Sequence, residues 1–146
     1  MRSRMKGALG LILLAGLAGL GACDWFEDQR PEEVTVLVTG DAGVTVEVIT
    51  SKKLVAARTE TGETRVQLLE ADTAMVTIPW SETYNIAGDY RFFLQVANPD
   101  SPDPVVNAEV LLDGKSRYDQ GGILREVPFR FLYLFNQRMG AVVEVL

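Results

Sequence analysis

The chain has no histidine and only one cysteine among its 146 residues. A Ser-His-Asp triad and a Cys-His nucleophile both require an imidazole, so this sequence cannot build either one. Zinc sites made of histidine and cysteine are excluded for the same reason. Carboxylate pairs, a Ser-Lys dyad and a calcium site are the chemistries that the composition still allows. We therefore expect a protein that is not an enzyme and that needs no cofactor.

Positive charge is scarce as well, and much of it lies at the N-terminus. Residues 1–22 contain three of the 14 basic residues and none of the 20 acidic ones, so the rest of the chain has 11 against 20, a net charge of −9. That charge disfavours binding to nucleic acid or to anionic lipid through bulk electrostatics. The remaining 124 of the 146 residues suffice for one domain with a hydrophobic core, and not for two.

The N-terminus has the organisation of an export signal. Arg2, Arg4 and Lys6 precede an uncharged segment that runs from Gly7 to Ala22. A basic start followed by an apolar run is typical of a secretory signal. The run is also shorter than the roughly 20 residues that a membrane-spanning helix needs. We therefore expect residues 1–22 to be a cleaved signal peptide.

The cysteine stands directly after this apolar run, in Leu20-Gly21-Ala22-Cys23. A leucine, two small residues and a cysteine resemble the lipobox of bacterial lipoproteins, in which the chain is cut before the cysteine and the thiol takes the lipid. The alternatives are a plain membrane anchor, or a signal cleaved elsewhere with an incidental cysteine. A lone cysteine in an exported protein cannot form an internal disulfide and is a reactive liability. We therefore predict a lipoprotein that is held by palmitate-type acyl chains on Cys23.

This prediction divides the chain into three parts. Residues 1–22 are the signal peptide, residues 23–33 are the lipidated N-terminus with an acidic tether, and residues 34–146 are the domain. The tether DWFEDQRPEE spans at most about 35 Å when extended. The protein is then anchored on the periplasmic or another extracytoplasmic face of a membrane. Asp24 resembles the signal that retains lipoproteins of enteric bacteria in the inner membrane, which favours that membrane.

Strand signals begin at Val34. VTVLVT (34–39) and VTVEVIT (44–50) are rich in β-branched residues, and residues 40–43 between them are typical of a turn, so we predict a hairpin. LVAART (54–59) and TRVQLLE (64–70) are predicted to form a second hairpin.

The rest of the chain continues this pattern. A strand over residues 73–80 is expected to be stopped, or pushed to a sheet edge, by Pro79. Asp113-Gly114 predicts a further turn. The other expected strands cover residues 90–98, 105–113, 115–118, 128–136 and 141–146. Eight or nine short strands without a long helical period predict an all-β fold, an antiparallel immunoglobulin-like β-sandwich of about seven to nine strands.

The strand at residues 128–136 is apolar on both sides. Phe129, Phe131, Tyr133 and Phe135 share one face, and the opposite face includes Leu132 and Leu134. A strand with two apolar faces is expected to be central in its sheet or covered by another segment. An exposed partner-binding patch is the alternative, and the buried position explains the pattern with fewer assumptions.

Three segments of the domain, taken together, suggest a family. In VTVLVTGDAGVTVEV (34–48), a Val-Thr-Gly turn joins two valine- and threonine-rich strands. VTIPWSETYNI (76–86) has Pro-Trp-Ser after Ile78, and FLQVANPDSPDPVVNAEVLLDGKSRY (93–118) ends its second strand in Asp-Gly-Lys. These features resemble the MmpS-like family of small mycobacterial membrane proteins and their relatives, which have Leu-Pro-Trp-Ser, Ala-Gln-Asn and Asp-Gly-Lys in this order.

The resemblance covers residues 34–118 and implies an anchored extracytoplasmic β-sandwich. The mycobacterial members act as accessory partners of large lipid and siderophore exporters, so it also implies a protein partner in the envelope. This chain departs from the family in three respects. It has a lipobox in place of a transmembrane helix, it lacks a cysteine in the later strands, and its aromatic C-terminal strands have no clear counterpart.

Few residues in the domain are candidates for a binding site. Trp80, after Pro79, is a candidate ligand-stacking residue at one end of the sandwich. We favour the alternative, a core or edge plug whose indole packs on the domain. Loop aspartates could supply calcium ligands, but aspartate beside proline or glycine is ordinary turn chemistry, and we favour that reading. The aspartates in question are Asp100, Asp103, Asp113 and Asp119.

Two further features are read as structural. Lys52 and Lys53 are expected to protect an edge strand against aggregation. Ser51 beside Lys52 is not a credible Ser-Lys dyad, because nothing indicates a buried lysine. We therefore expect no catalytic residue and no metal site.

The sequence thus favours a non-catalytic interaction or accessory module of an envelope or transport complex, with no nucleic-acid partner. The alternative is a periplasmic lipoprotein that binds a small molecule or glycan, in a pocket near Trp80 or the loop aspartates. An enzyme that uses carboxylates alone is a third hypothesis, and it requires two acidic groups that converge in a cleft.

Overall fold

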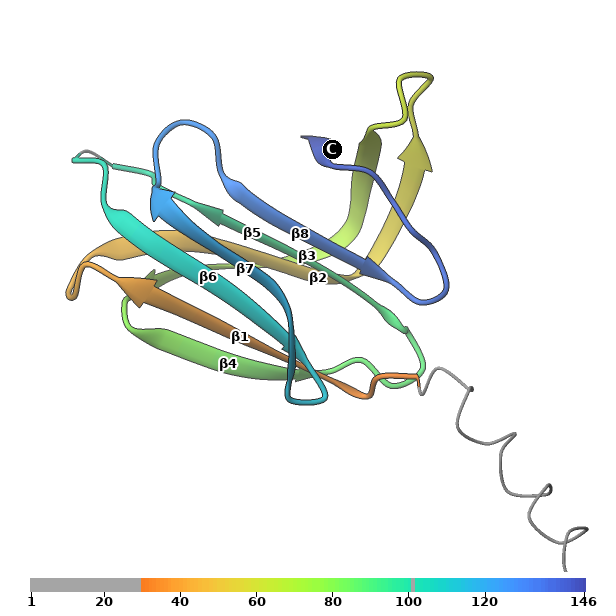
Figure 1. Ribbon diagram of the computed structural model, residues 1–146, viewed down its shortest axis with the longest axis horizontal. Coiled ribbons are helices and arrows are strands. Elements are labelled where there is room, and N and C mark those ends of the chain that lie inside the picture. The colour runs from red at the N-terminus through yellow and green to blue at the C-terminus, as the bar shows by residue number, and fades with distance from the viewer. Residues whose placement is uncertain (1–29, 101) are drawn as a thin grey trace, which may run out of the picture.

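The computed structural model describes residues 30–100 and 102–146, so the predictions on the signal peptide and Cys23 lie outside the described residues. The described part has nine strands and no helix: β1 (Glu33–Gly40), β2 (Thr45–Arg58), β3 (Thr64–Thr77), β4 (Trp80–Asn85), β5 (Arg91–Ala97), β6 (Val105–Leu112), β7 (Lys115–Ile123), β8 (Phe129–Leu134) and β9 (Val142–Val145). They form a four-stranded sheet, β4-β1-β6-β7, and a five-stranded sheet, β8-β5-β2-β3-β9. The sheets pack face to face (Figure 1), which confirms the predicted β-sandwich.

The first core fills the space between the two sheets. On β1 the side chains of Val34, Val36 and Val38 are fully buried, whereas the residues between them are only partly buried. Val46 and Val48 of β2 close the core from the opposite sheet. Burial of one valine stabilises the fold by about 1.5–3 kcal/mol, so this regular alternation holds the layers together.

Residues 34–39 and 44–50 do not form the predicted hairpin. β1 lies between β4 and β6 in one sheet, and β2 lies between β5 and β3 in the other. The turn after Gly40 therefore carries the chain across the sandwich. The alternation of valines specifies which side of each strand is buried. It does not specify whether the next strand pairs in the same sheet or packs from the opposite one, and here the two valine faces pack on each other.

β2 and β3 are longer than predicted. The expected strands 44–50 and 54–59 are parts of β2, and 64–70 and most of 73–80 are parts of β3; each strand has 14 residues. The predicted second hairpin is confirmed, since Arg58 pairs with Thr64. Irregular register near Ser51 and Lys53 marks bulges, so the polar residues there lie within one strand and do not separate two strands.

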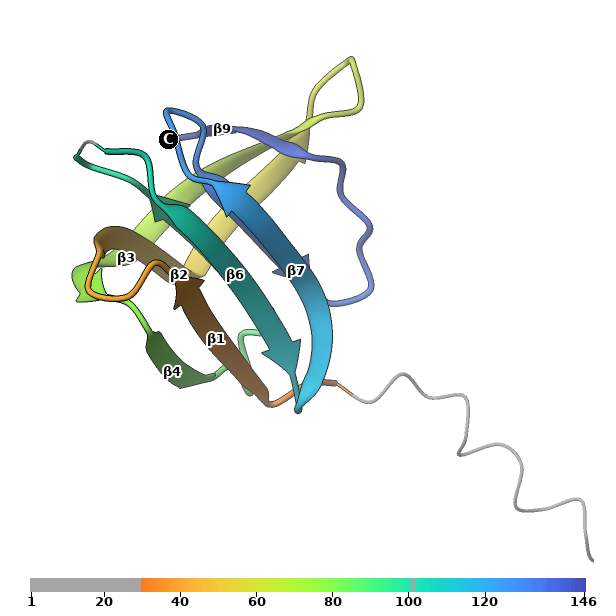
Figure 2. The ribbon, with the colours of Figure 1, turned by 60° about the vertical axis from the view of Figure 1, so that its left-hand side comes forward.

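A second core lies on the other face of the five-stranded sheet. Leu54 of β2, Val66 of β3 and Phe93 of β5 are buried together in it. Phe93 is flanked by Phe92 and Leu94, which belong to the first core, so the two cores lie on opposite sides of β5. The bulges in the β2–β3 hairpin turn its outer half so that it covers this face, as Figures 1 and 2 show.

The second core accounts for the two apolar faces of β8. Phe129 and Phe131 contact the first core, whereas Leu132 and Leu134 pack against the second. β8 is an edge strand and not a central one, so of the two explanations offered for this pattern, coverage by another segment is correct. β9 completes the cover, and it pairs with β3 in the parallel direction, an exception in an otherwise antiparallel structure.

The remaining strands follow the sequence signals in part. Pro79 lies between β3 and β4, so it ends the strand as predicted. β4 was not predicted because Trp-Ser-Glu-Thr-Tyr-Asn is polar and lacks apolar alternation; it is an exposed edge strand that pairs with β1. Asp113 and Gly114 form the predicted turn, with φ angles of 47° and 75°. The following strand, β7, continues to Ile123, past the predicted end at residue 118, because it pairs with β6 along its whole length. No helix of the described residues is long and apolar enough to cross a membrane.

Candidate interaction sites

Trp80 is the first residue of the edge strand β4. It pairs with Val38 of β1, and its half-buried ring packs against the first core. This position fits the plug that the sequence favoured, although ligand stacking by Trp80 stays a prediction. Cys23, the predicted lipid attachment point, lies outside the described residues.

The four loop aspartates do not come together. Asp103 precedes β6 and Asp113 follows it, so these two lie at opposite ends of the strand. Asp119 is in the middle of β7, opposite Glu109, and the backbone N–H of Asp100 donates to the Asn98 side chain in a local turn. Within residues 30–100 and 102–146, no three acidic, histidine or cysteine side chains could hold a metal ion together. The turn explanation therefore fits Asp100 and Asp113, whereas Asp119 lies within a strand.

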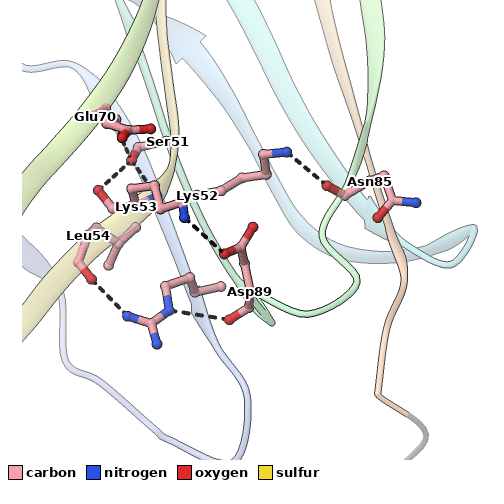
Figure 3. A network of polar contacts seen from close by, with 8 residues as sticks. Ser51, Lys52, Lys53, Leu54, Glu70, Asn85 and Asp89 are labelled. Carbon is pink, nitrogen blue, oxygen red and sulfur yellow. Dashed lines mark hydrogen bonds and ion pairs between the residues drawn. The ribbon is translucent and has the colours of Figure 1, made fainter.

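Ser51, Lys52 and Lys53 lie at the bulge in β2 (Figure 3). The Ser51 hydroxyl lies 3.0 Å from the Lys53 carbonyl oxygen and 2.5 Å from that of Glu70, so it serves backbone groups that the bulge leaves unpaired. Lys52 donates to the Asn85 carbonyl at 3.1 Å. β5 pairs with β2 only as far as Ser51, so Lys52 and Lys53 lie where one side of β2 loses its paired neighbour, and their protection of an edge stays a prediction. The bulge has a structural role.

Arg91 completes this network where β5 stops pairing with β2. Its guanidinium donates to the Leu54 carbonyl at 3.0 Å. This carbonyl lies beyond the last residue of β2 that pairs with β5, so the arginine supplies the hydrogen bond that a strand would otherwise provide. A second arginine, Arg130 of β8, donates to the Gln95 side chain at 2.8 Å and to the Val143 carbonyl at 3.2 Å. These contacts join β8, β5 and the segment of β9 around the second core.

The chain enters the domain through a fixed segment. The guanidinium of Arg30 lies over the rings of Tyr90 and Phe135, 5.3 Å and 5.5 Å from their centroids. Oδ1 of Asp113 then accepts the backbone N–H groups of Glu32 and Glu33, each at 3.0 Å. Residues 30–33, which the sequence assigned to the tether, are therefore attached to the domain.

An open groove lies at the opposite end of the domain. It has a volume of about 630 Å³ and lies among the segments before β6 and before β8. Asp103 and Arg125 line it and form an ion pair at 3.3 Å. Ile123 and Val127 also line it, with exposed fractions of 52% and 77%, so it offers apolar as well as charged contacts. Sequence reasoning named only Asp103 of these residues, because isolated apolar residues in polar loops give no periodic signal.

Acidic groups of β3 and of the edge strand β4 surround the phenol of Tyr84. The phenol of Tyr84 donates to the Glu82 carboxylate at 3.1 Å. Burial raises the pKa of Tyr84 to about 12, a hydrogen bond with Thr50 opposes this, and the negative charges of Glu82 and Asp72 add to it. Asp72 of β3 therefore lies within electrostatic reach of β4, with its own side chain exposed.

Comparisons of this chain with protein families, with curated proteins and with solved structures found no match.

Proposed function

We propose that this protein is a bacterial lipoprotein, anchored through Cys23 outside the cytoplasm, whose β-sandwich is a non-catalytic interaction module of an envelope or transport complex. One observation carries the proposal: the lipobox-like Leu20–Cys23 ends an apolar run, and its cysteine stands ten residues before the first strand at Glu33. The resemblance of residues 34–118 to MmpS-like proteins supports an accessory role.

The fixed segment at the start of the domain makes the proposed tether short. If residues from Arg30 onward belong to the domain, only residues 24–29 separate it from Cys23, and these reach at most about 21 Å at ~3.5 Å per residue. The domain would then work close to the lipid surface, with the Arg30 end toward the membrane and the groove end away from it. Several acyl chains on one cysteine would make such attachment nearly permanent, at about 0.8 kcal/mol per buried methylene.

Purification from native membranes tests the interaction role. The wild-type protein, solubilised in mild detergent, is expected to bring down an envelope protein in fixed stoichiometry. The Cys23→Ser form is the matched control, because it has the same domain without the attachment point for lipid. It is expected to be recovered outside the detergent-extracted fraction and without that partner. Repeated recovery of the wild-type protein alone would count against the proposal.

The groove favours one alternative function, a lipoprotein that binds a small molecule or glycan. Its supporting observation is the juxtaposition of the Asp103–Arg125 ion pair with exposed Ile123 and Val127 in one concavity. Such a mixture of charged and apolar groups is common in ligand sites. Thermal unfolding in the presence of a panel of sugars and small anions tests it. A ligand that raises the unfolding temperature of the wild type and not of Arg125→Gln would favour this alternative.

A further inference from the structure

The β3 strand leaves one long stretch of backbone open. β9 pairs with its beginning, at Thr64 to Val66, and Leu68 donates to the carbonyl of the last residue, Leu146, at 2.9 Å. Beyond Leu68, in the part of the chain that the structure describes, no strand lies on the outer side of β3. The open edge comprises residues 69–77, and β9 shows that this side of β3 accepts an added strand.

The direction of the backbone groups along the open edge follows from one hydrogen bond. Ile78 donates its N–H to the Val44 carbonyl at 2.9 Å, which is the side of β3 that faces β2. Backbone groups alternate between the two sides of a strand, so those of Thr77, Met75 and Thr73 point outward. These outward N–H and C=O groups form the ladder that a further strand requires.

Part of the open edge has none of the features that usually block such pairing. The bulge beside Leu69 and the charges of Glu70 and Asp72 lie at its start, and the remaining residues, 73–77, contain no charged residue, proline or glycine. The other outer strands are different: β4 and β8 have six residues each, and β7 contains Lys115, Arg117 and two consecutive glycines. Leu69 and Met75 on the open edge are 60% and 54% exposed. An added strand would cover them.

Charge indicates what kind of strand fits. Glu70 and Asp72 are exposed and two residues apart, so they lie on the same face of β3. Side chains on a neighbouring strand come within about 5 Å of their cross-strand partners, where opposite charges attract and like charges repel. Two copies of this edge, paired about Ala71, would instead bring their acidic residues together.

We infer that residues 69–77 bind an extended segment of a partner protein that carries two basic residues separated by one position. The partner segment adds to the five-stranded sheet beside β3, and its basic side chains lie next to Glu70 and Asp72. This inference rests on the proposed role as an interaction module, because it names the surface and the partner chemistry through which that role is exercised.

Two synthetic peptides test the inference on the full-length protein in detergent solution. The first, Thr-Val-Lys-Val-Lys-Val-Thr, has the required charges, and the second has glutamate in place of both lysines. Hydrogen exchange followed by mass spectrometry is expected to show slower exchange in residues 69–77 with the lysine peptide only. Unchanged exchange with both peptides, or equal protection by both, would overturn the inference. This readout needs no variant of the protein.

Substitutions at Thr73 provide the matched comparison. Thr73→Pro removes an outward N–H, a change that edge strands tolerate, and is expected to weaken binding of the lysine peptide about tenfold, since the loss leaves one ladder position unpaired. Thr73→Val keeps the N–H and the β-branched shape, so its affinity is expected to match that of the wild type. Equal binding by Thr73→Pro and Thr73→Val would overturn the inference.

A last arm separates the inference from its alternatives. If the unliganded protein is a dimer that Thr73→Pro makes monomeric, the occupant is a second copy and the inference is wrong. Peptide binding in detergent does not depend on lipid at Cys23, so failure here leaves the lipoprotein assignment standing. Conversely, if Cys23 proves to carry no lipid, the binding of the lysine peptide to residues 69–77 is expected to be unchanged.

Discussion

The carboxylate of Asp41 and the backbone of Val105 hold one end of the β1–β6 pair together. Asp41 Oδ2 accepts the Val105 N–H at 2.8 Å, and the Asp41 N–H donates to the Val105 carbonyl at 2.9 Å. At the other end Asp113 accepts the N–H groups of Glu32 and Glu33. Each strand is thus followed by an aspartate that caps the start of its antiparallel partner. This pair lies at the centre of the four-stranded sheet, next to the segment through which the chain enters the domain.

Replacement of Asp113 by alanine is expected to lower the free energy of unfolding by about 2 kcal/mol. The change removes two hydrogen bonds and places alanine at a φ of 47°, a conformation that aspartate and asparagine tolerate better. Asp113→Asn keeps the Oδ1 acceptor and is expected to lose less than about 1 kcal/mol. Urea denaturation measures both values, and equal losses for the two variants would contradict the capping role.

Gly40 and Gly43 flank the turn that carries the chain across the sandwich, and replacement by alanine is expected to have a larger effect on stability at Gly40 than at Gly43. A Cβ at Gly40 would lie 2.1 Å from the Val105 carbonyl oxygen, and φ there is +136°. Gly40→Ala is therefore expected to cost about 3 kcal/mol or more, through both strain and a backbone clash. Gly43 also has a positive φ, +84°, but a Cβ there meets nothing within 4 Å, so Gly43→Ala is expected to cost only about 1 kcal/mol. Denaturation midpoints that coincide for the two variants would show that β1 and β6 do not approach as described.

The second core is tested by neighbouring residues of β2. Leu54 is 1% exposed and packs with Phe93, whereas Val55 is 52% exposed. Leu54→Ala is expected to destabilise the protein by about 2–5 kcal/mol, and Val55→Ala by about 0.5 kcal/mol or less. A larger loss of stability for Val55→Ala than for Leu54→Ala would mean that Val55, and not Leu54, faces the second core.

Two tyrosines give the fold a dependence on alkaline pH. Burial raises the pKa of Tyr84 and of Tyr118 to about 12 from the ordinary value of 10; for Tyr118 a hydrogen bond that the phenol oxygen accepts from the Arg130 backbone opposes the shift. Because the folded pKa is above the unfolded one, their contribution to stability is complete below pH 10. It is lost as the pH rises from about 10 toward 12.

Absorbance at the wavelength of tyrosinate follows this titration directly. In the wild type two phenols are expected to ionise near pH 12, and the Tyr84→Phe, Tyr118→Phe double variant is expected to lack that phase. The double variant should also lose less stability than the wild type between pH 10 and 12. If the absorbance change near pH 12 were the same in the double variant, it would come from groups other than Tyr84 and Tyr118.

The sequence predicted the fold class and the buried faces, because a period of two and β-branched residues depend only on local geometry. It did not predict which strands pair. Val34 to Val38 and Val46 to Val48 have the same pattern whether they lie side by side or face each other across a core. Ser51 to Lys53 looked like a break because a bulge places polar residues inside a strand without ending it.

The interaction sites were predictable only in part. The lipobox-like segment is a local motif, so the sequence alone suggests it. The groove and the open edge of β3 depend on what lies next to them in space, and no local pattern encodes that β9 pairs with β3 only from Thr64 to Val66. Glu70 and Asp72 have meaning as a pair only once β3 is known to be an outer strand over that stretch.

Lipid on the cysteine thiol is the claim on which the proposed function depends most, and the mass of the mature N-terminal peptide tests it most directly. Protein extracted from native membranes and digested with a protease is expected to yield a peptide that begins at Cys23 and carries the mass of attached acyl chains. A peptide that contains Cys23 unmodified, either internally or as the first residue, would contradict the account.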